Sequence, residues 1–421
     1  MIKFKILKAE DYCDSVRDGT HDSPKKTDSG YKLITSKHIK EYGLDLDSAY
    51  CISEKDFNKV NERSAVNIND ILYSMIGTIG LMYRVKSQPN YAIKNMGLFK
   101  ISDEIKSKWL YYYLKSPKMQ NYIKSLLNGS TQQYITLSNL RQIPIEMPEN
   151  EGDMKKIIKV LDLIDKKIQI NTKTNDNLQK LVNGLYIKYF VNFDGYIGEY
   201  KDTDLGMIPE IFNVDTLGNV ITFSNGYGWN SKDMLDVGSE DTYKVFKMAN
   251  INIGGGINKS KTKSWIEKDK TSNLEQYITK KGDILMCMTD MKNSGNPLLG
   301  HTALIDKDDE FVINQRVGII RCNKGLGYSY IYTMSNLKYF INDIRSRANS
   351  GVQVNLTTKG ICDTLVLVPD DNTLNKFQQV AEPLYEKIFN NNNENETLEQ
   401  LRDTLLPKLM NGEIDLDKIE I

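Results

Sequence analysis

The chain has 421 residues, with 55 basic and 55 acidic side chains and 40% hydrophobic residues. This length predicts two or three domains, and the composition excludes a disordered chain. The balanced charge excludes a simple polycation that coats nucleic acid, although basic surfaces can still form locally.

Two sequence features point to a cytoplasmic protein without a metal centre. No apolar run approaches the roughly 20 residues that a membrane-spanning helix needs, and the first residues alternate like a strand and lack the apolar core of a signal peptide. The five cysteines are scattered, and there are only three histidines. We therefore expect reduced thiols, no bound metal and no membrane partner.

The expected elements follow one plan twice along the chain, which gives an α/β (α+β) fold class. Each half begins with a strand-rich globular domain and continues as a long helix. The expected boundaries are a first domain at 1–150, a helix at 151–191, a linker at 192–205, a second domain at 206–371, a helix at 372–412 and a tail at 413–421.

The two expected helices share one apolar pattern at an offset of 220 residues. Apolar side chains recur at alternating spacings of four and three, which is the heptad pattern of a coiled coil. Both seams turn polar at the same two places, Asn171 and Asn175 in the first and Asn391 and Asn395 in the second. The alternative is two unrelated amphipathic helices, each packed on its own domain. The expected pairing residues are Ile157, Leu161, Ile164, Ile168, Leu178, Leu185, Phe377, Leu384, Ile388, Leu398, Leu405 and Leu409.

Two details of the second helix and of the linker refine this plan. Pro383 and the asparagine run 390–393 predict that the second helix is kinked or frayed midway. The linker is polar and punctuated by glycine, which predicts a solvated boundary loop.

The globular domains also repeat. Asp70 and Asp283 each precede an Ile-Leu strand, and Gln132 has a counterpart in Gln353, 221 residues later. Between such anchors the halves differ almost wholly in residues. A repeated framework with divergent insertions predicts one scaffold that carries two different recognition domains.

Four stretches of this sequence resemble the specificity subunits of type I restriction–modification systems. They are Asp18–Pro24 with Gly30–Ile39, the pair Ser130–Thr136 and Gly351–Thr357, Ile157–Asp165, and Leu398–Asp415. The resemblance covers essentially the whole chain. It departs from the family where 185–190 lacks the proline of the second half and where the second domain lacks the Asp-Gly-Thr-His opening and begins at Phe223–Trp229.

The resemblance implies a role in choosing the DNA sequence and no catalysis by this chain. Each globular domain would be a target recognition domain that reads one half of a bipartite double-stranded DNA site, and the two helices would form an antiparallel spacer. Two adenine-N6 methyltransferase subunits and the restriction and translocase subunits would be its partners. S-adenosylmethionine, ATP and Mg²⁺ would bind to those partners, and no cofactor to this chain.

The candidate DNA contacts are basic, amide and glycine-turn residues. Residues 1–150 hold 22 basic and 17 acidic side chains, an excess of 22 − 17 = 5. Phosphate contacts set register and base contacts specify sequence, and an ordinary solvated face remains the alternative. Gln132 and Gln353 recur in both halves, which favours a framework or phosphate role. The candidates are Asp18, Thr20, His21, Lys25, Lys26, Lys37, Gly77, Thr78, Lys94, Asn95, Gln132, Lys261, Lys263, Lys292, Asn293, Asn314, Gln315, Arg316 and Gln353.

Two other functions stay open at this point. Asp194, Glu199 and Lys201 have residue types that hold Mg²⁺ and activate water in nucleases, although they fall in the expected linker, whereas such a site needs paired strands. A coiled-coil scaffold without any role on DNA is the other alternative. The sequence contains no phosphate-binding loop of the Gly-x-x-x-x-Gly-Lys type.

Overall fold

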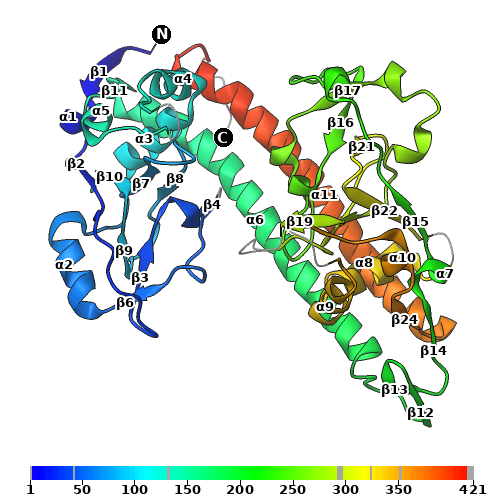
Figure 1. Ribbon diagram of the computed structural model, residues 1–421. Helices are drawn as coiled ribbons and strands as arrows, with labels where there is room; N and C mark the ends of the chain where they lie inside the picture. The colour runs from blue at the N-terminus through cyan, green and yellow to red at the C-terminus, as the bar shows by residue number, and fades with distance from the viewer. Residues whose placement is uncertain are drawn as a thin grey trace. The chain divides into compact units, whose positions relative to one another are not determined.

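The computed structural model describes residues 2–40, 43–129, 133–291, 297–322, 325–349 and 353–414. Within them the chain forms two compact units. The first unit runs to Thr172 and resumes at Asn392, and the second unit spans Lys173–Asn391. Helices α6 (Glu151–Phe190) and α11 (Asp371–Met410) each begin in one unit and end in the other (Figure 1). No helix in the described part of the chain has the length and apolar content needed to cross a membrane.

The body of the first unit contains small sheets and short helices. Its central sheet has the strand order β2-β10-β7-β8, and a second sheet has the order β6-β3-β9 with β3 and β9 parallel. The elements are β1 (Phe4–Lys8), α1 (Ala9–Tyr12), β2 (Ser15–Asp18), β3 (Tyr31–Ile34), η1 (Ser36–His38), β4 (Ile39–Lys40), β5 (Gly43–Leu44), β6 (Cys51–Ile52), α2 (Glu54–Ser64), β7 (Ile71–Ser74), β8 (Met82–Arg84), β9 (Tyr91–Ile93), β10 (Met96–Lys100), α3 (Glu104–Lys115), α4 (Pro117–Ser125), α5 (Leu137–Arg141) and β11 (Pro144–Pro148).

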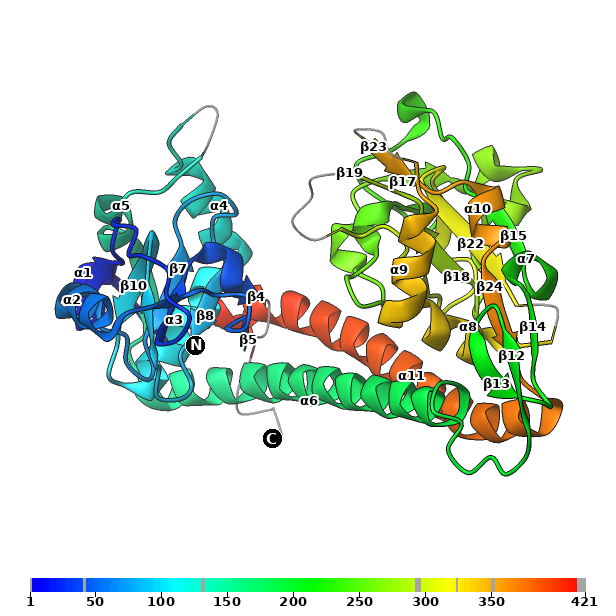
Figure 2. The ribbon, with the colours of Figure 1, turned by 60° about the horizontal axis from the view of Figure 1, so that its bottom comes forward.

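The second unit repeats the topology of these two sheets. Its central sheet has the order β15-β22-β18-β20, in which β18 and β22 lie side by side (Figure 2), and β16 pairs with β17 and, in parallel, with β21. The elements are β12 (Tyr200–Thr203), β13 (Gly206–Pro209), β14 (Asn213–Thr216), α7 (Leu217–Val220), β15 (Thr222–Asn225), η2 (Ser231–Asp233), β16 (Thr242–Phe246), η3 (Met248–Asn250), η4 (Lys259–Lys261), β17 (Trp265–Glu267), η5 (Lys268–Thr271), η6 (Glu275–Tyr277), β18 (Ile284–Cys287), β19 (Thr289–Met291), β20 (Thr302–Leu304), β21 (Phe311–Ile313), β22 (Val317–Arg321), α8 (Gly327–Ser335), α9 (Lys338–Ser346), β23 (Gln353–Asn355), α10 (Thr358–Cys362) and β24 (Leu365–Val368).

A buried ion pair at the start of the central sheet is repeated in both bodies. The carboxylate of Asp70 pairs with Lys100 at 3.0 Å, and that of Asp283 pairs with Arg321 at 3.1 Å. Each aspartate also accepts a backbone N–H from three residues earlier, at 2.8 and 2.9 Å, which fixes the turn into the strand. Burial of the carboxyl group raises the pKa of Asp70. This repeat confirms the predicted equivalence of Asp70 and Asp283 and shows that the framework tolerates either cation.

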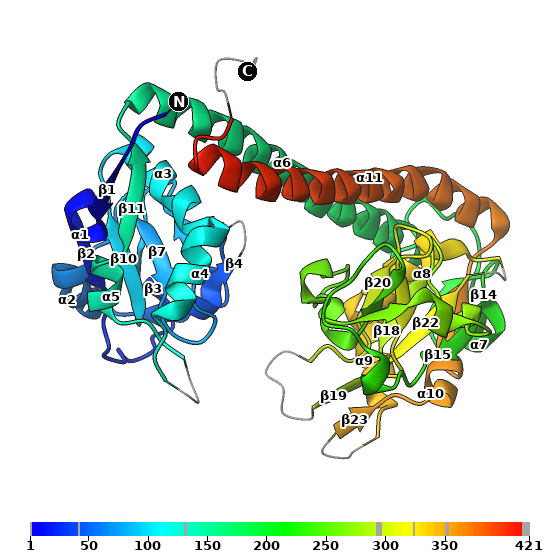
Figure 3. The same cartoon turned by 90° about the horizontal axis from the view of Figure 1, so that it is seen from above.

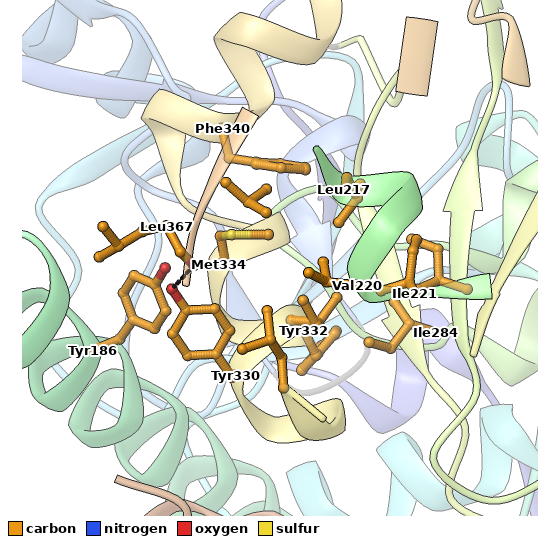
Figure 4. Packing of buried hydrophobic residues seen from close by; sticks show 14 of the residues in the cluster. Tyr186, Leu217, Val220, Ile221, Ile284, Tyr330, Tyr332, Met334, Phe340 and Leu367 are labelled. Carbon is orange, nitrogen blue, oxygen red and sulfur yellow. Dashed lines mark hydrogen bonds between the residues drawn. The ribbon is translucent and has the colours of Figure 1, made fainter. Parts of the chain in front are cut away.

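The helix ends complete the cores of both bodies. In the first unit Ile157 and Leu161 of α6 and Leu409 of α11 belong to one buried cluster with Trp109 of α3. In the second unit the ring of Tyr186 from α6 lies 5.1 Å from that of Tyr330, whose hydroxyl donates to the carbonyl of Leu367 at 2.8 Å (Figure 4). Each body therefore depends on residues from both long helices for its hydrophobic core.

Helices α6 and α11 pair in antiparallel fashion in each unit (Figure 3). In the first unit Asn171 donates to Asn395 at 2.9 Å, and in the second Asn391 donates to Asn175 at 2.7 Å. The later residue of α6 pairs with the earlier residue of α11, as antiparallel helices require. The four asparagines that were predicted as polar seam positions therefore form two pairs. A polar side chain in an apolar helix seam fixes register because any shift leaves it unpaired.

The prediction of one narrow seam is only partly correct. Six predicted pairing residues are buried, namely Ile157, Leu161, Ile164, Ile168, Phe377 and Leu409. Six others are only half-buried, namely Leu178, Leu185, Leu384, Ile388, Leu398 and Leu405. Val182, Tyr186, Tyr385, Phe389 and Leu406 are the buried residues near them. The reason is that each helix also packs on a globular body, so its buried stripe is wider than a coiled-coil seam and turned toward that body.

Two further expectations need correction. α11 runs without interruption through Pro383 and the asparagine run, so the expected fraying is wrong. The expected linker 192–205 is not wholly a loop, because β12 pairs with β13 in a hairpin that begins inside it. Gly206, the first residue of β13 directly after the turn, has φ +88°, a backbone conformation that glycine adopts without strain.

Candidate nucleic-acid interface

The loop that follows β2 is held against the turn between β9 and β10. The N–H of Gly19 donates to the carbonyl of Met96 at 2.8 Å, and the N–H of Asn95 donates to Thr20 at 3.0 Å. A Cβ at Gly19 would lie 2.5 Å from the carbonyl oxygen of Ile93, so only glycine allows this approach.

The second unit builds the same loop with different side chains. Gly226 follows β15, and its N–H donates to the carbonyl of Val317 at 2.9 Å. Tyr227 bridges to Asn314 as Thr20 bridges to Lys94. The second domain therefore has a structural counterpart of the Asp-Gly-Thr-His opening, which its sequence did not reveal. The equivalent residues are Asn225, Gly226, Tyr227 and Gly228. Glycine alone is kept because it is the residue that the backbone geometry requires.

Four polar side chains meet at this loop in the first unit. The carboxylate of Asp18 is buried and binds both Arg63 from α2 and Nε2 of His21, the latter at 3.0 Å. Nδ1 of His21 lies 2.9 Å from Oδ1 of Asn95. The backbone carbonyl of Arg63 accepts from Arg17 at 2.8 Å. Three of the sequence candidates are thus brought together, and they hold an arginine that the sequence did not single out.

An open pocket of about 630 Å³ lies between this loop and α2, which stands beside β2 and β9 (Figure 1). Thr20, His21 and Lys25 line it from the loop. Lys59 and Arg63 line it from α2. Basic side chains on two elements thus face one concave surface, which Asp22 and Asp56 also line, and such cations can contact a phosphate backbone.

The remaining candidates of the first unit lie in several places. Lys94 bonds the hydroxyl of Ser23, which places it on the same loop surface. Lys26 is exposed beside Lys25, Lys37 is exposed on η1, and neither lines the pocket. Gly77 and Thr78 are exposed at the turn between β7 and β8. Gln132 lies outside the described residues.

In the second unit the turn between β21 and β22 carries three candidates. Gln315 and Arg316 are exposed, and the N–H of Arg316 donates to the side chain of Asn314 at 3.3 Å. The indole of Trp229 donates to the carbonyl of Ile313 at 3.0 Å and supports this turn. The turn is the structural counterpart of Lys94 and Asn95, so equivalent positions present different polar groups.

The other described candidates of the second unit differ in exposure. Lys261 and Lys263 are exposed, whereas Lys259 of the same basic stretch binds Asp306 and Glu310 at 3.2 and 2.8 Å. Gln353 is half-buried in β23, paired with Met291. Lys292 and Asn293 lie outside the described residues.

The Asp194, Glu199 and Lys201 segment does not assemble a site in this structure. Asp194 and Glu199 are exposed, and Lys201 donates to the backbone carbonyl of Glu210 at 2.8 Å. In the described part of the chain, no group of three or more His, Cys, Asp or Glu residues could hold a metal ion. The geometry gives the nuclease alternative no support.

Comparison with known proteins shows what the chain is similar to. Residues 1–180 match the family model described as "Type I restriction modification DNA specificity domain". The chain is 26% identical over 326 residues to the type I restriction enzyme MjaIX specificity subunit of Methanocaldococcus jannaschii, covering 75% of this chain and 71% of that protein. It is 21% identical over 415 residues to the HindI specificity subunit of Haemophilus influenzae, covering 84% and 88%.

The fold agrees with these sequence matches. The crystal structure of the type I restriction–modification system S subunit from M. genitalium superimposes with a TM-score of 0.55 and 18% identity, and covers 97% of this chain and 96% of that one. The similarity therefore extends over both units. Residues 1–180 thus match the DNA specificity domain of type I restriction–modification systems, and most of the chain is similar in sequence to specificity subunits of such systems.

Proposed function

We propose that this chain is the DNA-specificity subunit of a type I restriction–modification complex and that each unit reads one half of a bipartite double-stranded DNA site. The observation that carries the proposal is the pair of equivalent loops with different side chains. Asp18 and His21 stand in the first unit where Asn225 and Gly228 stand in the second. Base-reading residues must differ between half-sites, whereas the framework that presents them can repeat.

In this proposal the chain performs no chemistry of its own. Its partners supply adenine-N6 methylation, translocation and cleavage, and they bind S-adenosylmethionine, ATP and Mg²⁺. The chain binds DNA and positions the methyltransferase at each half-site. The antiparallel helices act as a spacer between the two half-sites.

The test is to co-express the chain with its methyltransferase and to map methylated adenines in the host DNA. We expect one asymmetric site made of two short specific sequences separated by unspecified bases. A continuous site, or methylation without sequence preference, would contradict the proposal. Replacing residues 206–371 with the corresponding domain of a relative should change the second specific sequence and leave the first intact.

The helices carry equivalent exposed leucines that fit two methyltransferase contacts. Leu181 of α6 is 52% exposed and Leu401 of α11 is 45% exposed, and the two positions are 220 residues apart. An exposed large apolar side chain on an otherwise polar helix face is a common anchor of protein interfaces. The duplication supports one methyltransferase for each unit.

We predict that Leu181→Asp and Leu401→Asp will each reduce the complex from two methyltransferase subunits to one. A charge buried in an apolar contact costs several kcal/mol, which is enough to break it at micromolar concentration. Native mass measurement of the co-expressed complex gives the stoichiometry. The matched control is Ile170→Asp, because Ile170 is 51% exposed but its counterpart is the polar Asn390. A wild-type complex saturating at one methyltransferase would refute the arrangement.

A further inference from the structure

Arg63 is an exposed arginine whose guanidinium is anchored at one end. It lies in the last turn of α2 and lines the pocket beside the loop after β2. Its side chain is 61% exposed, and one terminal nitrogen binds the carboxylate of Asp18, which is 9% exposed. Its backbone carbonyl is held by Arg17. The structure thus fixes the position of Arg63 from both its backbone and its side chain.

An arginine held in this way is preorganised to donate hydrogen bonds to two acceptor atoms that lie in one plane. A guanidinium carries five N–H donors in a rigid fork, and the contact to Asp18 uses one terminal nitrogen of a side chain that lines the pocket. The O6 and N7 atoms of guanine in the major groove match this fork. Because the Arg63 side chain is already held by Asp18, it loses less conformational entropy when it contacts DNA. This favours binding of a base whose acceptors fit the fixed position of the guanidinium.

The neighbouring polar groups are less suited to read a base. Both ring nitrogens of His21 are engaged, one by Asp18 and one by Asn95, so this ring supports the carboxylate. Lys25 and Lys59 have flexible stems and act as point charges, which suits phosphate contacts. Compared with His21, Lys25 and Lys59, Arg63 combines unused hydrogen-bond donors with a guanidinium that is held in place.

The second unit lacks this arrangement. Asn225 replaces the buried carboxylate, and the segment between β17 and β18 forms only the short turns η5 and η6 where the first unit has α2. A contact made by Arg63 therefore belongs to the first half-site alone, as a sequence-reading contact should.

We propose that Arg63 reads a guanine in the half-site of the first unit and that Asp18 is its positioning residue. This inference rests on the proposed function, because it names one contact within the DNA recognition proposed above. It commits the contact to the major groove, since the minor groove presents a different set of groups.

The test compares variants of the full chain in complex with its methyltransferase. The wild-type complex is measured first, and a lack of sequence preference there would refute the proposed function itself. Given a wild-type site, we expect Arg63→Ala to lower discrimination at one guanine of the first half-site by about 10-fold or more and to leave the second half-site unchanged. Methylation mapping and DNA binding to single-base variants of the site provide the readout.

Three further variants keep the test decisive if Arg63→Ala folds poorly. Arg63→Lys keeps the charge and loses the fork, so it should lose the same preference. Asp18→Asn introduces the side chain found in the second unit and should weaken that preference at the first half-site while leaving the second half-site unchanged. Lys59→Ala should weaken binding equally on all sequences and reduce its salt dependence. An unchanged preference in Arg63→Lys, or a change in the second half-site, would overturn the inference.

Discussion

Inserting four residues between Asn171 and Asn175 is expected to lengthen the gap between the two half-sites and to leave both half-sites unchanged. Four residues lengthen a helix by about 6 Å, and base pairs stack about 3.4 Å apart, so the upper bound is roughly two base pairs. The downstream helix face rotates by only about 40°, because four residues are close to one turn. Sequencing of methylated sites measures the gap directly.

The asparagine pairs sharpen this experiment. The insertion shifts α6 relative to α11, and both Asn171–Asn395 and Asn175–Asn391 must remain paired. A single insertion therefore strains the helix pairing and can give a change of only one base pair, with DNA bending to adapt. A matched insertion of four residues between Asn391 and Asn395 restores equal lengths and should give the full change. Unaltered spacing with full activity in the matched variant would refute the spacer role, and altered half-site bases would show that the helices contribute to reading.

A fragment of residues 1–205 is expected to self-associate and, with methyltransferase, to modify a palindromic site made of the first half-site twice. The core of the first unit includes Leu406, Leu409 and Met410 of α11, which the fragment lacks. A second copy of the fragment can supply residues at the equivalent places, 220 positions earlier, from its own α6. The exposed core would otherwise be an aggregation hazard.

The oligomeric state and the methylated site of this fragment are both measurable. Sedimentation should give twice the mass of one fragment, and methylation mapping should return a symmetric site. Tyr186→Asp within the fragment should abolish the association, because Tyr186 occupies the place equivalent to Leu406 and would then bring a charge into that core. Recovery of the original asymmetric site from the fragment would contradict this prediction.

The periodicity of the sequence was sufficient to predict the plan of the fold. Apolar spacing predicted both long helices to within two residues at each end, and the shared polar positions Asn171, Asn175, Asn391 and Asn395 proved to be partners. The Asp-Ile-Leu motif correctly matched Asp70 with Asp283, and each of these buried carboxylates pairs with a cation, Lys100 or Arg321. The helix bounds, the polar seam positions and the repeated aspartates could be predicted because each is marked by a local pattern of residues.

Other features depended on contacts between distant residues. The sequence placed Leu178 and Leu384 in the helix seam, but the bodies turn the buried stripe toward Tyr186 and Tyr385. Glycine spacing suggested a loop at 192–205, where pairing between β12 and β13 forms a hairpin. Neither outcome can be read from a helical or turn pattern alone, because the packing partner decides which face is covered.

The candidate DNA surface also combines residues that the sequence predicted with a residue that only the tertiary structure revealed. The sequence by itself determined the duplicated scaffold and marked Asp18, His21 and Asn95, whose residue types and places in a distinctive loop could be recognised. Only the tertiary structure joined them to Arg63, which is 45 residues from Asp18 along the chain. Asp18 pairs with Arg63 because the two side chains are close in the folded chain. They become close when α2 packs beside β2 and β9.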